Sequence, residues 1–197
     1  KSTTPVAVGD NVSISLREDN TAYINDILPR RNYIVRKASN LSKQSHILAA
    51  NVDTCLLVVT VNYPATSTTF IDRFLASAEA YRVPVVLLFN KTDLYNDEEH
   101  ATLDTLIALY KKIGYRCIRT STTTGEGIDE VKEVVQGGVS LLAGNSGVGK
   151  SSLVNAISPE TAARIGEISK THNKGMHTTT YSEMFEFLPG SYLVDTP

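Results

Sequence analysis

The chain has 197 residues, of which 42% are hydrophobic, and its formal net charge is −2. This balance excludes a globally basic nucleic-acid binder, so any RNA contact has to come from a local patch. No apolar run approaches the roughly 20 residues of a membrane helix and no signal peptide opens the chain, which predicts a soluble cytoplasmic protein without membrane contact.

The first 50 residues are rich in short β-prone runs separated by polar turns. The runs cover residues 12–16, 22–24 and 32–35, and one of the turns is residues 18–20. This pattern predicts a small antiparallel β module. Because the length suits a small domain joined to a medium one, we divide the chain into residues 1–52 and 53–197.

From Thr54 onward, apolar strands alternate with longer amphipathic segments, which is typical of βαβ units on a parallel sheet in an α/β domain. The predicted strands are residues 55–61, 85–89, 116–120, 139–143, 181–188 and 192–194. The predicted helices are residues 70–81, 97–113, 128–136 and 150–156. Cys55 and Cys117 fall inside apolar runs and far apart, which predicts buried thiols rather than a zinc site or a disulfide.

The first motif along the chain is Asn90-Lys91-Thr92-Asp93, which directly follows the predicted strand 85–89. A carboxylate at Asp93 accepts two hydrogen bonds from guanine, whereas adenine lacks the exocyclic amine and leaves an acceptor unpaired. We expect Asn90 to bind the base edge and to tether the phosphate loop, and the stem of Lys91 to cover the ring. Alone, the motif is also compatible with a polar turn.

A serine- and threonine-rich loop, residues 120–127, follows the next predicted strand. In GTPases a loop at this place donates a backbone N–H to guanine O6, so we assign Ser121 and Thr122 to the nucleotide site. The composition of the loop is common. Its place one βα unit after the Asn-Lys-x-Asp motif supports the assignment.

A glycine-rich stretch lies between the predicted strand 139–143 and the helix that begins at Lys150, and it fits G-x-x-x-x-G-K-[ST] in the required strand, loop and helix context. Lys150 would reach the β- and γ-phosphates and Ser151 would bind Mg²⁺. A chance glycine turn is the competing interpretation. The residues predicted to bind the nucleotide are Gly144, Asn145, Ser146, Gly147, Val148, Gly149, Lys150, Ser151 and Ser152.

The order of these motifs is unusual, because base recognition precedes the phosphate loop. The terminal Asp195-Thr196-Pro197 looks like the start of Asp-x-x-Gly, which ordinarily follows the phosphate loop. The order predicts a circularly permuted P-loop GTPase, with the join at Gly137 and Gly138. A P-loop ATPase or small-molecule kinase is an alternative, and the carboxylate at Asp93 argues against it.

These residues resemble the ribosome small-subunit-dependent GTPase A group, also called YjeQ or YloQ GTPases. The resemblance covers essentially the whole chain and rests on the permuted order, the phosphate loop, residues 175–180 as switch I, and Leu28-Pro29-Arg30-Arg31 in the β module. It implies a small OB-like β-barrel, then the permuted GTPase domain, then a zinc-binding domain. It also implies GTP hydrolysis stimulated by the small ribosomal subunit, in late maturation of that subunit.

Two departures from the family pattern stand out. We expect zinc only in a C-terminal domain that this chain does not contain, and the chain stops before the Asp-x-x-Gly glycine. Both ends look cut, which predicts a part of a longer protein. The β module also lacks an obvious first strand, which leaves the completeness of its barrel open.

The catalytic residues implied are Lys150 and His177, with His177 orienting the attacking water. A surface histidine in a loop is the equally weighted alternative for His177. The residues assigned to Mg²⁺ are Ser151, Thr178 or Thr179, and Asp195 through a water.

Basic residues flank the tyrosine-containing run 32–35, namely Arg30, Arg31, Arg36 and Lys37. With the resemblance, they predict contact with the RNA of the small ribosomal subunit. A solvated basic turn is the alternative. We expect a monomer that binds GTP, GDP and Mg²⁺. A nucleotide-dependent binding module with negligible turnover remains a further alternative.

Overall fold

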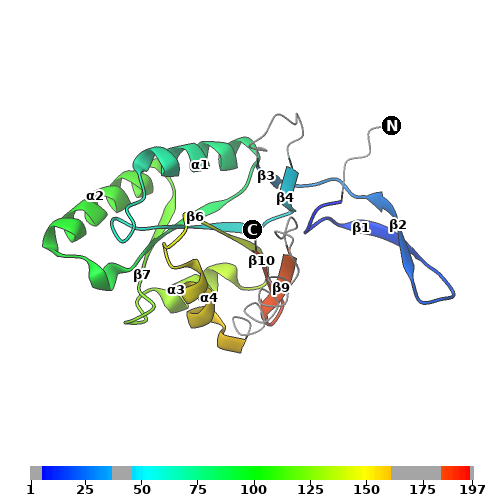
Figure 1. The fold of residues 1–197 in the computed structure, drawn as a ribbon. Coiled ribbons are helices and arrows are strands. Elements are labelled where there is room, and N and C mark those ends of the chain that lie inside the picture. Colours follow the sequence, from blue (N-terminus) through cyan, green and yellow to red (C-terminus); the bar gives the residue numbers. More distant parts are fainter. Residues whose placement is uncertain (1–5, 37–45, 161–182, 196–197) are drawn as a thin grey trace, which may run out of the picture.

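A computed structural model describes residues 6–36, 46–160 and 183–195. Its centre is a six-stranded sheet in the order β7-β6-β5-β8-β10-β9, with helices on both faces (Figure 1). The strands are β5 Thr54–Val59, β6 Val85–Asn90, β7 Arg116–Thr120, β8 Val139–Ala143, β9 Glu183–Leu188 and β10 Ser191–Asp195. The helices are α1 Thr68–Ala80, α2 Asp97–Ile113, α3 Ile128–Val135 and α4 Lys150–Ile157, with a short 3-10 turn at Thr92–Leu94.

The predicted strands and helices are confirmed in the described residues with small shifts at their ends, but one strand runs in the opposite direction to that expected. Strand β9 pairs antiparallel with β10, whereas the other pairs of this sheet are parallel. The reason is the short turn at Pro189 and Gly190, where Gly190 has a φ of 69°. A turn of this length closes a hairpin, while parallel strands need a long crossover.

Local signals in the sequence set the ends of the helices. Helix α2 starts with a capping box between Asn96 and Glu99, and it ends at Gly114, whose φ is 112°. The Ser67 side chain accepts a hydrogen bond from the Phe70 N–H at the start of α1. The contacts of Asn96 and Ser67 satisfy N–H groups that a helix leaves unpaired in its first turn.

Two hydrophobic clusters fill the two faces of the sheet. One joins β5 to α1 and α2 through residues such as Leu57 and Ile71, and the other joins it to α3 and α4 through residues such as Leu56 and Val131. Adjacent residues of a buried strand serve opposite faces because side chains alternate. The central strands β5 and β6 are therefore buried on both sides. The carboxyl ends of the parallel strands β5, β6, β7, β8 and β10 point toward the same edge of the sheet.

The two cysteines are buried free thiols, as predicted. Burial raises the pKa of Cys55 to about 12 and that of Cys117 to about 11. Across the described residues, the helices are too short or too polar to cross a membrane.

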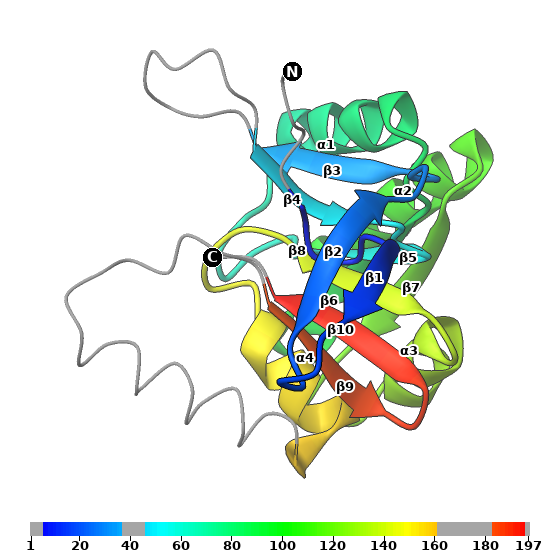
Figure 2. The same ribbon diagram turned by 90° about the vertical axis from the view of Figure 1, so that its right-hand side faces the viewer.

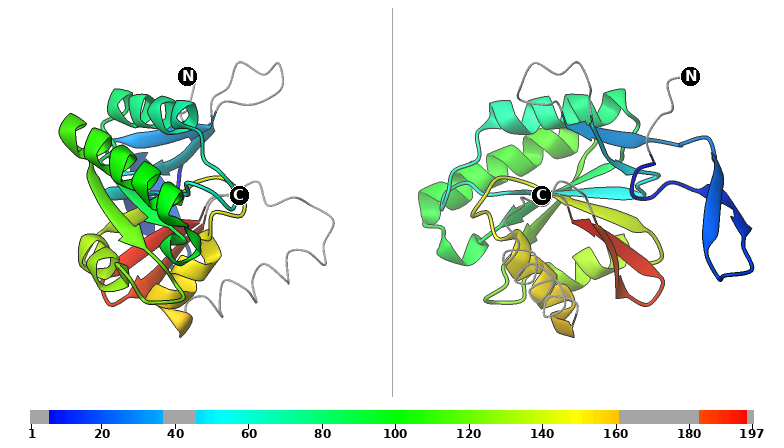
Figure 3. Two further views of the ribbon diagram at one scale, coloured as in Figure 1. Left: turned by 90° about the vertical axis from the view of Figure 1, so that its left-hand side faces the viewer. Right: turned by 45° about the vertical axis from the view of Figure 1, so that its right-hand side comes forward.

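The N-terminal part forms two separate two-stranded antiparallel sheets in the described residues. Strands β1 Val12–Leu16 and β2 Ala22–Ile27 make a hairpin that extends away from the large sheet (Figure 1, Figure 3). Strands β3 Tyr33–Arg36 and β4 His46–Ala50 lie beside α1 (Figure 2). A closed barrel is not formed by the described strands, and the OB-like domain stays a prediction.

Strands β3 and β4 share a core with the large sheet. Ile34 and Ala49 pack in the cluster that contains α1, and the rings of Tyr33 and Tyr81 lie 5.0 Å apart. The buried Asn32 side chain donates to the carbonyl oxygens of Val52, at 2.8 Å, and of Arg82, at 3.1 Å. The division at residue 52 therefore crosses a packed contact, and it remains a prediction.

Candidate nucleotide-binding site

The glycine-rich loop connects β8 to α4 at the carboxyl edge of the sheet. Gly144 has a φ of 141°, and a Cβ built there would lie 2.4 Å from the Val58 carbonyl oxygen. A Cβ on Gly149, whose φ is 101°, would lie 2.4 Å from Nδ2 of Asn90. Both positions require glycine, so the loop packs closely against β5 and the Asn-Lys-x-Asp turn.

Lys150 and the two serines stand at the start of α4. The Lys150 Nζ donates to the carbonyl oxygens of Gly144, at 2.7 Å, and Asn145, at 2.8 Å, so its ammonium group lies across its own loop. Ser151 and Ser152 are exposed on the first turn of the helix. A phosphate group at this helix N-terminus would meet a cation and the positive end of the helix dipole.

Asn90 joins the glycine-rich loop to the Asn-Lys-x-Asp turn. It is 1% exposed at the end of β6, and its Nδ2 donates to the Val148 carbonyl oxygen at 2.9 Å. Its Oδ1 accepts from the Thr120 hydroxyl at 3.0 Å. With both polar atoms of its amide engaged, Asn90 fixes three loops relative to one another.

Lys91 makes a second connection between the same loops. Its backbone is left-handed, with a φ of 64°. Its Nζ donates to the Gly147 carbonyl oxygen at 2.6 Å and to that of Tyr63 in the loop after β5. The side chain therefore connects two loops of the site, and the contact of its stem with a bound base stays a prediction.

Asp93 is exposed at the edge of the site and is held by the loop after β7. The Ser121 hydroxyl donates to Asp93 Oδ1 at 2.6 Å, while Ser121 itself is fully buried. This hydrogen bond, together with one from the Thr123 side chain, holds the pKa of Asp93 below its usual range. Asp93 is therefore an ionised acceptor throughout the neutral pH range.

The Ser121 hydroxyl also organises its own loop. It accepts from the backbone N–H groups of Thr123, at 3.2 Å, and Thr124, at 3.1 Å. The loop therefore curls around Ser121, and Thr122 lies exposed at its outer side. The Ser121 N–H donates to the Glu126 carbonyl oxygen at 3.1 Å, so a backbone contact of this loop with the base stays a prediction.

Sequence reasoning missed several residues that build this site. The Tyr95 hydroxyl donates to the Asn90 carbonyl oxygen at 2.6 Å and accepts from the Val61 N–H at 2.9 Å. The Thr92 hydroxyl lies 2.5 Å from the Glu126 carboxylate. The position of Glu126 between two glycines, Gly125 and Gly127, could have marked it as a loop residue of interest. Its contact with Thr92 could not be read from the sequence, because the two residues lie 34 positions apart.

The proposed switch residues His177, Thr178 and Thr179 lie outside the described residues. The backbone of Asp195 ends β10 and pairs with Glu183, and its side chain is not described. Strand β10 lies beside β8, so the Asp195 backbone reaches the edge that carries the phosphate loop. Ser151 supplies a hydroxyl oxygen there, a ligand type that fits Mg²⁺.

An open cavity of about 670 Å³ borders the phosphate loop on the side of the N-terminal strands. The residues that line it are Ile34, Val35, Leu48, Phe70, Phe74, Leu141, Leu142, Ala143, Gly144, Asn145, Ser146 and Lys150. The first half of the phosphate loop is therefore next to β3, β4 and α1 rather than isolated from them.

The structure corrects the predicted RNA contact at Arg30. Its side chain is 12% exposed and makes two 2.6 Å hydrogen bonds to Asp10, whose side chain is 1% exposed. Burial alone would raise the pKa of Asp10, but the hydrogen bonds from Arg30 and the Ala7 N–H leave it below its usual value. Arg30 is thus occupied by a buried carboxylate and is not available to a phosphate.

Arg31 differs from its neighbour because its side chain is 63% exposed. Its Nη2 donates to Asp53 Oδ1 at 2.7 Å and to the Asn51 carbonyl oxygen at 3.1 Å. Asp53 also accepts from the Val139 N–H at 2.8 Å, which ties Arg31 to the start of β8. Lys37 and the side chain of Arg36 lie outside the described residues.

Comparisons with known proteins agree with this geometry. The family model described as RsgA GTPase matches residues 27–197. Proteins named small ribosomal subunit biogenesis GTPase RsgA from Bacteroides fragilis and Porphyromonas gingivalis are 61% and 57% identical over 197 and 202 residues. Each match covers 100% of this chain and 64% of the relative, so the chain spans somewhat less than two thirds of their length.

Two solved structures share the fold. YjeQ from Thermotoga maritima has a TM-score of 0.76 and 38% identity, covering 98% of this chain and 61% of that one. YloQ, described as a circularly permuted GTPase, has a TM-score of 0.68 and 26% identity, covering 100% of this chain and 58% of that one. The fold is therefore the circularly permuted GTPase fold, and the chain belongs to the RsgA GTPase family.

Proposed function

We propose that this chain binds guanine nucleotides and hydrolyses GTP to GDP and phosphate. The observation that carries the proposal is the direct connection of the base-reading turn to the phosphate loop. Asn90 bonds Val148 and Lys91 bonds Gly147, so the two motifs form one site although the chain presents them in reversed order. The family membership supports the same activity.

The state of Asp93 favours guanine over adenine. An ionised carboxylate offers acceptors to the N1–H and the exocyclic amine of guanine, and hydrogen bonds to Ser121 and Thr123 keep Asp93 ionised. Adenine would leave these acceptors without donors, at the cost of an unpaired polar group. A P-loop ATPase or small-molecule kinase is therefore the weaker interpretation.

Hydrolysis requires positioning and charge stabilisation more than covalent chemistry. Lys150 supplies a positive charge next to the phosphate loop, where its ammonium group can exchange loop carbonyls for phosphate oxygens. Mg²⁺, when bound, would neutralise charge that develops on the phosphates. We assign Ser151, Thr178 or Thr179, and Asp195 to that ion, and His177 to the attacking water.

The names of the relatives and the exposed basic side chain of Arg31 support a proposed ribosomal role. The relatives' names place them in biogenesis of the small ribosomal subunit. For this chain we propose the same partner, in late maturation of that subunit, with residues 1–52 as an OB-like RNA-binding domain and residues 53–197 as the GTPase domain. The exposed Arg31 is the described residue of the predicted basic cluster that remains suited to a phosphate contact.

Single-turnover hydrolysis with and without small ribosomal subunits tests the proposed function. We expect slow GTP cleavage by the chain alone and faster cleavage with the subunits, while ATP competes poorly with GTP. Tight GDP binding with no cleavage under either condition would instead establish a nucleotide-dependent binding module. Equal competition by ATP would contradict guanine recognition.

Replacing Arg31 with Gln should weaken binding to small ribosomal subunits. Loss of one phosphate contact reduces the slope of log affinity against log salt concentration by about one, because fewer counterions are released. Titrations at several salt concentrations measure this slope. Arg116→Gln is the matched control, since Arg116 is also an exposed arginine paired with a carboxylate. An unchanged slope in the Arg31 variant would remove this residue from the RNA interface.

A further inference from the structure

Glu126 contacts the guanine-recognition turn through its side chain. Its Oε2 accepts from the buried Thr92 hydroxyl at 2.5 Å, whereas the same hydroxyl lies 3.3 Å from the Thr120 carbonyl oxygen. A hydroxyl has one proton, and the shorter contact to a charged acceptor is the stronger one. Thr92 is therefore anchored to the Glu126 carboxylate.

This anchor acts on the residue that reads the base. Thr92 stands between Lys91, whose backbone is left-handed, and Asp93. The loop after β7 carries both Glu126, which holds the Thr92 side chain, and Ser121, which donates to Asp93. Fixing Thr92 and Asp93 from the same loop restricts the direction in which the Asp93 carboxylate points.

The backbone around Glu126 is itself fixed. Its carbonyl oxygen accepts from the Ser121 N–H at 3.1 Å, which closes the loop on the other side of the site. Gly127 has a φ of 71°, and a Cβ there would lie 1.9 Å from the Arg119 carbonyl oxygen. The close approach to β7 leaves little freedom in the segment that carries Glu126.

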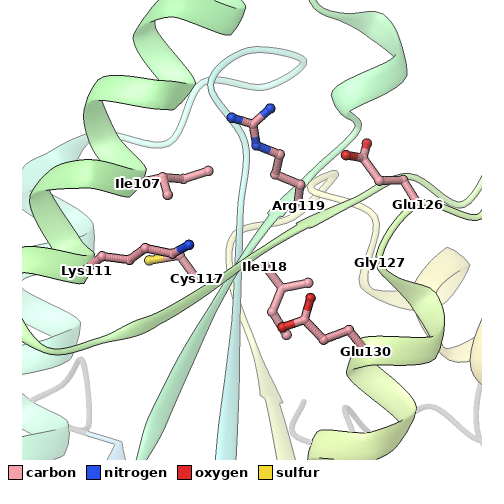
Figure 4. A pocket seen from close by; sticks show the side chains of 8 residues that line it. All are labelled: Ile107, Lys111, Cys117, Ile118, Arg119, Glu126, Gly127 and Glu130. Atoms are coloured by element: carbon pink, nitrogen blue, oxygen red, sulfur yellow. The ribbon is translucent and has the colours of Figure 1, made fainter.

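Charged side chains line a pocket next to Glu126. A pocket of about 330 Å³ between α2 and α3 has Glu126 at its rim, with Lys111 and Arg119 also lining it (Figure 4). Arg119 is paired with Asp104, and Glu130, which lines the same pocket, is paired with Arg116 at 2.9 Å. These ion pairs occupy both arginines, and the Glu126 carboxylate is bonded to the Thr92 hydroxyl.

We propose that Glu126 is a positioning residue for guanine recognition, which acts through the Thr92 hydroxyl to aim Asp93 at the base. This inference rests on the proposed function. It assigns to the second loop a role in specificity that is separate from any backbone contact made by Ser121 or Thr122.

The test compares Glu126→Ala, Thr92→Val and the double variant in binding to GDP and to IDP, whose base lacks the exocyclic amine. Each single variant should weaken GDP binding about tenfold and lower the ratio of GDP to IDP affinity by a similar factor, since a charge-assisted hydrogen bond is lost. The double variant should be no weaker than either single one, because the two residues form one contact.

Control variants separate positioning from a general loss of structure. Thr92→Ser keeps the hydroxyl and should keep the wild-type affinity ratio, while Glu130→Ala removes an exposed carboxylate of the same pocket and should not change the ratio. Additive effects in the double variant, or GDP and IDP affinities that fall by the same factor, would overturn the proposal. Wild-type protein that binds no GDP would overturn the proposed function itself, and this is measured first. If Glu126→Ala does not fold, the near-isosteric Thr92→Val decides the outcome alone.

Discussion

Lys150→Ala should weaken binding of GDP and GTP by about a hundredfold or more and abolish measurable GTP hydrolysis. The ammonium group lies against the Gly144 and Asn145 carbonyls, where phosphate oxygens would replace them as partners. Loss of a preorganised cation that contacts developing phosphate charge costs roughly two to three orders of magnitude in rate. Titration with a fluorescent GDP analogue and single-turnover hydrolysis measure the two effects.

Lys132→Ala provides the matched control for this variant. Lys132 lies on α3 and is 3.4 Å from Asp129 in an exposed pair, so its removal should leave affinity and rate near wild type. Retained turnover in Lys150→Ala would refute the phosphate-loop assignment. Loss in both variants would indicate a general effect of charge instead of a phosphate contact.

The sheet and the motifs on it were predictable because their signals are local. Strands such as β6 are short apolar runs, and both nucleotide motifs follow such runs directly. Parallel strands place their carboxyl ends at one edge, so Asn90 and the glycine-rich loop were expected at the same edge. The strand order, in which only β5 separates β6 from β8, brings them close enough for the hydrogen bond from Asn90 to Val148.

The features that sequence reasoning missed depend on pairing between distant residues. Arg30 and Arg31 are adjacent in the sequence, yet Arg30 is paired with the buried Asp10, 20 residues away, and Arg31 remains exposed. A count of charged residues treats the two arginines alike, because it does not say which side chains are buried or what they contact. The contact of Thr92 with Glu126 was missed because it also joins residues that are distant in the sequence.

The direction of β9 is a different kind of error. The turn at Pro189 and Gly190 is too short for a crossover, and this was readable from the sequence. The alternating pattern of the earlier βαβ units was extended over a segment in which no helix separates the two strands. The hairpin places β9 at the edge of the sheet and leaves β10 beside β8.

Replacing Asp93 with Asn should lower the affinity for GDP by about a hundredfold and raise the affinity for XDP. The amide oxygen can keep the 2.6 Å hydrogen bond from Ser121, so the loop should retain its structure. The amide nitrogen then presents a donor where guanine requires an acceptor, and it suits the carbonyl group that xanthine carries in place of the amine. A mismatch of this kind leaves polar groups of the bound base unpaired, which produces strong discrimination.

Competition of GDP, XDP and IDP for one fluorescent nucleotide measures the exchange of specificity. Asp97→Asn is the control, because Asp97 is an exposed carboxylate in the first turn of α2 near the same edge. It should keep the wild-type order of affinities. If Asp93→Asn binds GDP as tightly as wild type, then Asp93 does not read the base. If XDP and GDP weaken equally, the turn has lost its structure rather than its specificity, and a thermal unfolding curve of the same variant shows which of these has occurred.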